Sequence, residues 1–598
     1  MLFKSGNINN NLIKSYKNIV LFAMLLLFSS LVQSIPDHVL INSADWRDVY
    51  SGIIYSNLLG VPNNFLTSTP HGPIILYEIP EGRTIEIITS ADKPFVVGYE
   101  SLVRSRGYEN PEELIFEQSN LELAKRLPNI NKFIIIDDSY GYNALSVAPY
   151  AVKAGYYVLF ASSANIRSID NFLTGKKIDD IIIYGQVDRE VRSALAKYNP
   201  ETINSESGSR FENNIRIVDK YSEIGSIKQV ILTNGEFIEA SMMSGKEAVL
   251  FIGKTNVPDE VAEYIKEKGI DIGVLIGNEL IGSATTIRRQ LGISVFVKFA
   301  RGARIPGGTI NPVEDLDRFP MPAYKLSLSI VSISYNKATR LLEVTYQNNV
   351  DIATYFKTTL TIKDSDGNIL AVNGSLDIEF IDGGETKTVV YSMNLEDAQN
   401  LGNLSGEIYT IYGESKTSLE NILRGTFPIE QIEVFDETDL KIIDLVYDAS
   451  AGKFIVTIKN TGPTDLYTDV ELVDLWINGE YITVSADEVE KIGAGETKKI
   501  SINVDMEEED LNDERNEKIT VRAVYGERKH ALIKTKTQEF DLKLKKFEFW
   551  IYIPIVVVLI ILIFFFILLI RRRKRCPRCR TMNKKSASHC RKCGHVFN

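Results

Sequence analysis

Four cysteines near the C-terminus have the spacing of a metal-binding site. They form two Cys-x-x-Cys pairs separated by ten residues. Each pair can turn two thiolates toward one ion at about 2.3 Å, and two pairs complete the tetrahedral shell of structural zinc. The sequence therefore predicts a structural Zn²⁺ site formed by Cys576, Cys579, Cys590 and Cys593. A shell of four sulfurs leaves no open position for catalysis.

The segment that carries these cysteines, residues 571–598, resembles the short zinc ribbons. It holds eleven Lys or Arg residues and no Asp or Glu. A segment this small cannot build an apolar core, so we expect the ion to supply its folding free energy. The chain has no other cysteine, which excludes disulfides upstream, and the thiolates suit a reducing cytosol.

An uncharged stretch of twenty-two residues, 549–570, directly precedes this ribbon. At 1.5 Å per residue, a helix of this length spans about 33 Å, which matches the hydrocarbon core of a bilayer. Trp550 and Tyr552 suit one interface, and the basic cluster from Arg571 to Arg575 suits the cytoplasmic one. We expect a single transmembrane helix in the plasma membrane, with the C-terminus in the cytoplasm.

The N-terminus has the pattern of a secretory signal. Lys14 and Lys17 precede an apolar run, and residues 32–34 offer small side chains for cleavage before Pro36. These features predict a signal peptide over residues 1–34. An uncleaved N-terminal anchor is the alternative, and either would export the residues that follow.

Composition and motifs argue against two classes of function. The net charge of −11 becomes about −22 once the basic tail is set aside, which disfavours nucleic acid as the main partner. No Gly-x-Gly-x-x-Gly or phosphate-binding loop motif is present. The histidines upstream of the tail, His38, His71 and His530, belong to no recognisable nucleophile motif, so we expect no enzyme activity.

A repeat of about 95 residues runs from Asp37 to Ala300. Each copy has an apolar strand, an acid or amide at the start of a helix, and a second strand that ends in glycine, the first at Phe95–Gly98. Short apolar strands that alternate with helices indicate parallel sheets. We expect an α/β head of three units, followed by a linker rich in Pro and Gly; the units are 37–130, 131–226 and 227–300, and the linker is 301–323.

The second unit has a family pattern: Tyr-Gly-Tyr-Asn-Ala-Leu after its first strand, Ile-Ile-Ile-Tyr-Gly at its glycine-ended strand, and Arg-Phe-Glu at 210–212. It resembles the type 2 cell-wall-binding repeat, which recurs in threes on prokaryotic surface proteins. The resemblance covers nearly half the chain and implies an anchor that grips anionic wall polymer in grooves between modules. The ligand residues that it implies are Asp48, Asn143 and Glu239 at the helix starts, together with Arg210.

Beyond residue 323 the pattern changes to alternating apolar and polar positions with Asn, Asp and Gly turns, which predicts β-structure. Two copies lie about 111 residues apart: 342–348 aligns with 454–460, and Gly384-Glu-Thr aligns with Gly495-Glu-Thr. They resemble the immunoglobulin-like adhesion modules of archaeal and bacterial surface proteins. We expect two seven-stranded sandwiches, at 324–430 and 436–543.

Together these features predict a non-catalytic, membrane-anchored protein on a prokaryotic cell surface. Its head would bind a cell-envelope glycan or surface-layer polymer, or mediate adhesion, and its sandwiches would form a stalk. The alternative is a single-pass receptor or an envelope-assembly subunit whose cytoplasmic ribbon recruits a protein partner.

Overall fold

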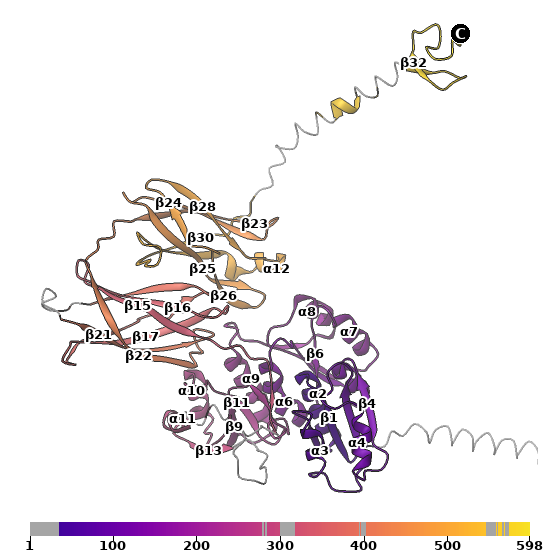
Figure 1. Cartoon of the computed structure of the whole chain (residues 1–598), viewed down its shortest axis with the longest axis vertical. Coiled ribbons are helices and arrows are strands. Elements are labelled where there is room, and N and C mark those ends of the chain that lie inside the picture. The colour runs from indigo at the N-terminus through magenta and orange to yellow at the C-terminus, as the bar shows by residue number, and fades with distance from the viewer. Residues whose placement is uncertain are drawn as a thin grey trace, which may run out of the picture.

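The computed structural model describes residues 35–277, 280, 284–298, 317–393, 395, 402–545, 558, 560–564, 567 and 573–597. Three parallel α/β units form a head, which lies below two immunoglobulin-like sandwiches in Figure 1. Near the C-terminus, a small hairpin lies beside the four cysteines. The expected combination of an α/β head and two all-β modules is confirmed.

Each head unit is built on a four-stranded parallel sheet with the same strand order. The orders are β2-β1-β3-β4, β6-β5-β7-β8 and β11-β9-β12-β13. The central strands are almost wholly buried, which is what a sheet covered on both faces requires. The strands are β1 (His38–Asn42), β2 (Asn63–Phe65), β3 (Ile85–Ser90), β4 (Glu112–Phe116), β5 (Lys132–Ile136), β6 (Tyr157–Phe160), β7 (Asp180–Tyr184), β8 (Glu201–Ile203), β9 (Gln229–Thr233), β11 (Ala248–Phe251), β12 (Ile272–Ile276) and β13 (Ser294–Lys298).

Helices connect these strands. The long ones follow the first strand of a unit, as α2 and α6 do, or lead from one unit to the next, as α9 does. The helices of the head are α2 (Trp46–Leu59), α3 (His71–Ile75), α4 (Tyr99–Ser105), α5 (Ser119–Lys125), α6 (Tyr142–Ala154), α7 (Ile166–Thr174), α8 (Arg189–Leu195), α9 (Arg210–Ile224), α10 (Asp259–Glu267) and α11 (Ala284–Leu291).

The strand expected at Phe95–Gly98 in the first unit was wrong, because β3 takes that place in the sheet. Pro94 has no N–H to donate to a ladder. The Asn42 side chain instead binds both backbone groups of Val96, at 3.0 Å to its N and 2.7 Å to its O. In the second and third units the strands that end before Gly185 and Gly277 are confirmed as β7 and β12.

The third unit also departs from the expected repeat. Asp48 and Asn143 lie on long helices, but the chain after Glu239 forms turns up to Ser244. The next strand begins at Ala248, whereas β2 starts fifteen residues after Asp48. Because an α-helix rises 1.5 Å per residue, the shorter segment cannot both form a three-turn helix and return to the sheet.

The three units share a large common core. One cluster of buried apolar residues runs through all three units, from Val39 to Met321, and a second, smaller cluster around Leu40, Ile87 and Tyr99 lies within unit 1. Equivalent edge strands end in Phe65, Phe160 and Phe251, and each of these rings packs against an aromatic ring outside its own unit. The head is therefore one folding body despite its internal repeat.

Two equivalent asparagines join neighbouring units through polar contacts. The Asn120 side chain binds the O of Val158 at 2.9 Å and the N of Phe160 at 3.0 Å, across the boundary between units 1 and 2. Asn214 makes the same pair of bonds to Val249 and Phe251, at 2.9 and 2.8 Å. Each asparagine thus pairs with backbone groups on an edge strand of the next unit, which that unit leaves without a partner.

The two sandwiches have similar layouts, with three strands in one layer and five in the other. They differ at one edge, because in the first sandwich a short parallel pairing at Ser334–Asn336 joins the two layers into one continuous sheet. Each has eight strands against the seven expected, because a short strand, β19 or β27, joins the larger layer. The two aligned Gly-Glu-Thr motifs lie just before equivalent strands, and Gly384 and Gly495 both adopt positive φ there. The strands are β15 (Leu328–Asn336), β16 (Leu341–Asn348), β17 (Thr354–Lys363), β18 (Ile369–Gly374), β19 (Glu379–Ile381), β20 (Thr386–Ser392), β21 (Leu404–Gly413), β22 (Asn421–Ile432), β23 (Leu440–Asp448), β24 (Lys453–Asn460), β25 (Leu466–Ile477), β26 (Glu480–Ser485), β27 (Glu490–Ile492), β28 (Thr497–Asn503), β29 (Lys518–Gly526) and β30 (Lys534–Asp541).

Equivalent hairpins connect each sandwich to the module before it. The hairpin at 413–420, between β21 and β22, contacts the head, where Ser209 Oγ lies 2.5 Å from Ser418 Oγ. The hairpin at 526–531, between β29 and β30, contacts the first sandwich, where Arg528 pairs with Glu343 at 2.8 Å. The second sandwich also touches the head directly, since Arg189 pairs with Asp510 at 2.7 Å.

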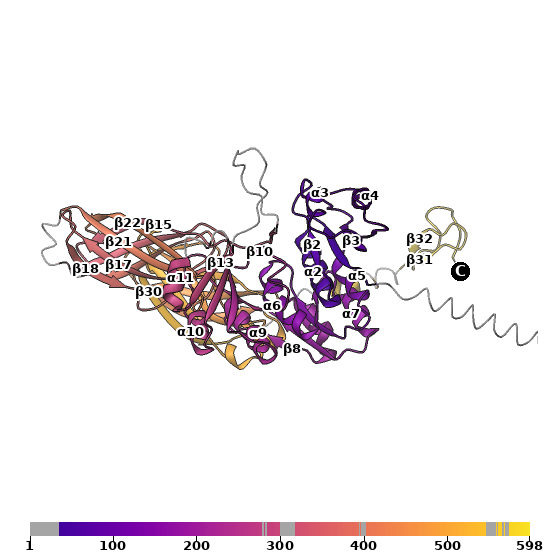
Figure 2. The same ribbon diagram turned by 90° about the horizontal axis from the view of Figure 1, so that it is seen from below.

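The sandwiches are consequently not a bare stalk that extends away from the head. Seen from below, the third unit with α10 and α11 lies beside the first sandwich (Figure 2). The end of the expected linker also packs on the head: β14 (Phe319–Pro320) pairs with β10 (Phe237–Ile238), and Met321 is buried.

Three sequence predictions fall wholly or mainly outside the described residues. They are the signal peptide at 1–34, the linker before residue 317, and most of the segment 549–570. The described part of that last segment, Val558, 560–564 and Ile567, is helical and exposes apolar side chains. Within the described parts of the chain, no helix has the length and apolarity needed to cross a bilayer.

Replacing Asn214 with alanine should destabilise the head by about 2–3 kcal/mol, because the change leaves the buried backbone O of Val249 and N of Phe251 without partners. Calorimetry of residues 36–545 would measure the loss in the head transition. The control is Asn403→Ala, at an exposed position, which should leave that transition unchanged. An equal effect of both variants would contradict the role of Asn214.

Candidate functional site

The four predicted cysteines do come together. Their sulfurs all lie within 4.8 Å of one another, with 3.6 Å between Cys576 and Cys593 and 3.4 Å between Cys579 and Cys590. Four sulfurs at about 2.3 Å from one zinc ion would be separated by about 3.8 Å, so the cluster needs little movement to hold an ion. The residues present therefore fit a tetrahedral metal site.

Local structure supports this arrangement of sulfurs. In each knuckle a backbone N–H closes a turn onto the first cysteine, from Arg580 to Cys576 at 2.8 Å and from Gly594 to Cys590 at 2.9 Å. The amides of Lys592 and then Cys593 lower the pKa of Cys590 to about 6, which favours the thiolate form that binds metals. At Cys593 the amide of His595 is instead outweighed by contacts with the other thiols, which raise the pKa of Cys593 to about 12. A bound ion would supply the tail with the cross-links that it otherwise lacks.

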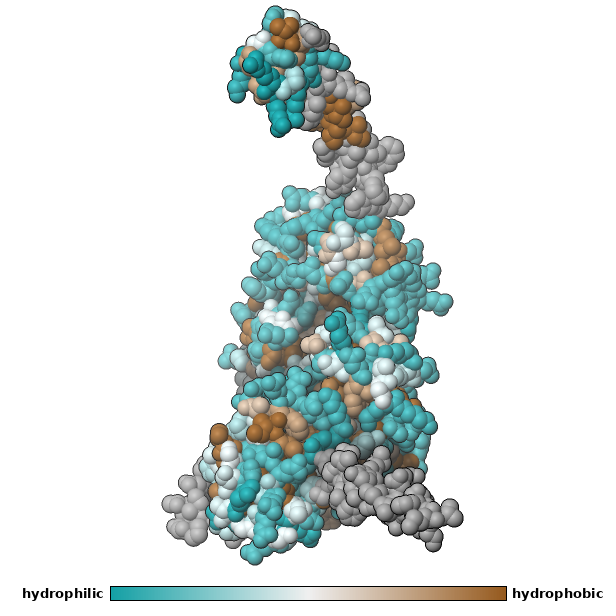
Figure 3. Space-filling view, turned by 90° about the vertical axis from the view of Figure 1, so that its right-hand side faces the viewer, coloured by the Kyte–Doolittle hydropathy of each residue, from teal (hydrophilic) through white to brown (hydrophobic). Residues whose placement is uncertain are grey.

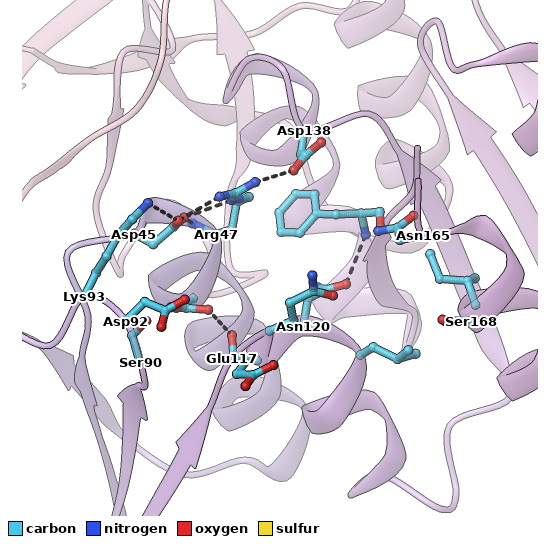
Figure 4. A pocket seen from close by; sticks show the side chains of 16 residues that line it. Asp45, Arg47, Ser90, Asp92, Lys93, Glu117, Asn120, Asp138, Asn165 and Ser168 are labelled. Atoms are coloured by element: carbon cyan, nitrogen blue, oxygen red, sulfur yellow. Dashed lines mark hydrogen bonds and ion pairs between the residues drawn. The ribbon is translucent and has the colours of Figure 1, made fainter. Parts of the chain in front are cut away.

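A second candidate site is the cleft between units 1 and 2 of the head. It has a volume of about 300 Å³ and opens where the strands β1, β3 and β4 end, beside the end of β6. Ligands bind to open parallel sheets at this carboxyl edge. Figure 4 shows its polar lining, with Arg47 between Asp45 and Asp138 at 2.8 Å from each.

The charge of this cleft is negative. Five carboxylates line it against two cations, Arg47 and Lys93, and both cations are already paired with Asp45. Asp92 and Glu117 are exposed at its rim. The cleft therefore offers acceptors and hydroxyl groups to a ligand, with little free positive charge for an anion.

The four ligand residues that the family resemblance implied do not meet in one place. Asp48 lines the cleft just described and accepts hydrogen bonds from Ser43 and Ser119, at 2.7 and 2.6 Å. Asn143 lies against Gly185, where a Cβ would come within 2.7 Å of its amide nitrogen. The glycine after β7 is required first by its φ of 71°, and the contact with Asn143 adds to that requirement.

Glu239 lines a separate cleft of about 380 Å³ between units 3 and 1. It is 3% exposed and accepts a hydrogen bond from Ser241 at 2.6 Å, and it also pairs with Lys298. Its Oε2 atom is buried without a hydrogen-bond partner. Two inter-unit clefts thus each carry one acid that the repeat pattern singled out.

Arg210 is placed differently from the expectation for a polymer contact. Its guanidinium is buried between the head and the first sandwich, paired with Glu414 and with Glu420 at 3.5 Å. It lies over the rings of Tyr142 and Tyr324, at 4.4 and 5.0 Å. The side chain is therefore occupied within the chain, where it joins two modules.

This junction holds more carboxylates than cations. Burial raises the pKa of Glu420 to about 8 and that of Glu260 to about 7, and it also raises the pKa of Glu414. Glu260 accepts a hydrogen bond from Ser418 on the docked hairpin, at 2.7 Å. The docked state thus retains protons at a pH where exposed glutamates are ionised.

Sequence reasoning missed Asn120, Asn214 and the two docking hairpins. The sequence does hold a signal for the asparagines, because each follows the helix serine that it binds by nearly the same number of residues. Asn120 lies 69 residues after Ser51, and Asn214 lies 68 residues after Ser146. The hairpins share the dipeptide Gly-Glu, at Gly413 and Gly526. No local signal showed which module each hairpin would contact.

Comparison with known proteins finds no family model and no curated protein that matches this chain. Solved structures match parts of it. The periplasmic chaperone SfaE is 12% identical and covers 37% of this chain and 100% of its own, with a TM-score of 0.13. Red sea bream transglutaminase is 9% identical over 38% of this chain and 32% of its own, also at 0.13. Likenesses at this level carry no argument about fold or function.

Metal removal should unfold the tail and leave the head and sandwiches intact, because the cysteine cluster is separate from the three main hydrophobic cores. Cobalt substitution should give thiolate charge-transfer absorption, which Cys590→Ser should reduce and Ser588→Ala should not. A fall in the melting temperature of the head after chelation would contradict this separation.

Docking of the head on the first sandwich should weaken as pH rises. Glu420 and Glu260 have raised pKa values in the docked state, so docking is strongest below the ordinary value of 4.5 and is progressively lost as pH rises toward 8. The protection of hairpin 413–420 against hydrogen exchange, taken relative to the intrinsic exchange rate at each pH, should therefore fall over this range. Glu420→Gln should flatten the dependence, whereas Glu430→Gln, at an exposed position, should not; an unchanged slope in Glu420→Gln would contradict the assignment.

Proposed function

We propose that this protein is a membrane-anchored, non-catalytic binding protein of a prokaryotic cell surface, and that the cleft between units 1 and 2 holds a saccharide of the cell envelope. The observation that carries the proposal is the position of a polar cleft at the carboxyl edge of a parallel sheet, between two units that share a core. The three-unit architecture also agrees with the resemblance to type 2 cell-wall-binding repeats.

The lining favours a neutral or amino-bearing saccharide over an anionic polymer. Hydroxyl groups can donate to Asp92 and Glu117 and can pair with Ser168, all of which are exposed. An anionic polymer would meet an excess of carboxylates, and Arg47 and Lys93 are neutralised by Asp45 and Asp138. The negative charge of the cleft thus favours neutral or amino-bearing saccharides over anionic polymers as ligands.

Anchoring rests on the segment 549–570. Its described residues are helical and expose apolar side chains to the outside of the chain, which suits contact with lipid. On this proposal the acidic head and sandwiches lie outside the cell, where they have no thiol to oxidise, and the thiolate cluster lies in the cytosol.

Retention of purified residues 36–545 on isolated envelope polysaccharide would test the proposal. Asp92→Asn with Glu117→Gln should weaken retention about tenfold or more, since two acceptors for saccharide hydroxyls change character.

The matched control is Asp377→Asn, which removes an exposed carboxylate from the first sandwich and should leave retention unchanged. No retention of the unaltered protein on any envelope polysaccharide would exclude the saccharide role. If the cleft variant is retained as well as the unaltered protein, the saccharide site lies elsewhere on the head.

A further inference from the structure

The hairpin beside the cysteine cluster has one strongly basic face. β31 (Arg573–Arg575) pairs with β32 (Met582–Lys584), and the register sets Arg573 opposite Lys584 and Arg575 opposite Met582. Side chains alternate along a strand, so these four residues share a face. Arg573, Arg575 and Lys584 are exposed on it, and Met582 is half-buried.

Two like charges directly opposite each other destabilise a strand pair. The tail contains no Asp or Glu that could offset Arg573 and Lys584. Among the described residues, neither of them takes part in an ion pair with the rest of the chain. The face therefore carries an unfavourable charge that an external anion would relieve.

The opposite face of the same hairpin is used inside the ribbon. Lys574 lies 4.2 Å from the centre of the Phe597 ring, and Asn583 is buried beside Cys590. In the described part of the ribbon, the cations of the first face make no comparable contact. Figure 3 shows the ribbon at the top of the molecule as a largely hydrophilic surface, next to the exposed apolar residues of the segment before it.

We propose that Arg573, Arg575 and Lys584 bind the anionic headgroups of phospholipids in the membrane that the chain crosses. The proposal rests on the membrane anchor proposed above. Only residues 571 and 572 separate Ile570 from the hairpin, which places its first strand within about 10 Å of the end of the apolar segment. That distance is close to the Debye length at physiological salt, so the charges act on the nearest anionic surface. Met582 suits the same position, since an apolar side chain can enter the headgroup boundary.

The test uses the full-length, zinc-loaded chain in lipid nanodiscs, with a fluorophore at Asn598 and an acceptor dye on a lipid headgroup. Energy transfer should be higher in discs of phosphatidylcholine with phosphatidylglycerol than in discs of phosphatidylcholine alone. High salt should abolish the difference, because the Debye length falls to about 3 Å at 1 M. Equal transfer in both kinds of disc would overturn the proposal.

Matched variants locate the effect on the hairpin face. Each neutralised cation weakens contact with an anionic surface about fivefold, so R573Q/R575Q/K584Q should reduce the docked-to-undocked ratio about a hundredfold. The control R578Q/R591Q/K592Q removes the same charge from the cysteine knuckles and should keep most of the transfer. Equal loss in both variants would overturn the assignment to this face.

Two further readouts distinguish lipid contact from loss of the metal site and from RNA binding. Cobalt absorption must be the same in both variants, so that a lost metal site is not mistaken for lost lipid contact. If energy transfer is equal in both kinds of disc but the tail binds added RNA, the face binds RNA and the lipid proposal is overturned. A chain that does not enter the discs at all would count against the membrane anchor, since transfer is measured only on discs that contain it.

Discussion

The architecture depends on a limit of small parallel sheets. The four-stranded units of this head do not cover their sheets and edge strands with their own helices alone. Each unit therefore uses its neighbour: Asn120 and Asn214 bind the backbone of the next edge strand, and the phenylalanine at the end of that strand enters a shared core. The clefts between units follow from this sharing, because the surfaces that meet are the carboxyl edges of the sheets.

The head and the two sandwiches also bury parts of their surfaces against one another, but the contacts between these modules are polar. Equivalent hairpins of the two sandwiches each reach back to the preceding module. Burying Arg210 with two glutamates costs desolvation, and only part of that cost is offset by the ion pairs. We expect this buried group to contribute more to the orientation of the modules than to their stability, because an apolar contact of the same size would hold them as firmly in many relative positions.

The sequence predicted what depends on local patterns. Cysteine spacing located the metal cluster, the 95-residue repeat located three parallel sheets, and Gly384 and Gly495 marked equivalent turns. It failed where a long-range contact decides the outcome. The chain around Val96 has the residues of a strand, but Asn42, which is distant in sequence, binds its backbone and holds it in a turn. Arg210 could be interpreted as a ligand residue for the same reason: nothing nearby in the sequence shows that Glu414 will face it.

Charge is separated along this chain in a way that bears on both proposed contacts. The cleft between units 1 and 2 has an excess of carboxylates, whereas residues 571–598 have none. A negative surface next to anionic lipid would be repelled from it, so the acidity of the head and sandwiches would hold them off the outer face of the membrane even though the sandwiches do not form an extended stalk. The basic ribbon would be attracted to the inner face. The negative charge of the lipid would then repel the acidic modules on one side of the membrane and attract the basic ribbon on the other. The apolar segment between them would keep each on its own side.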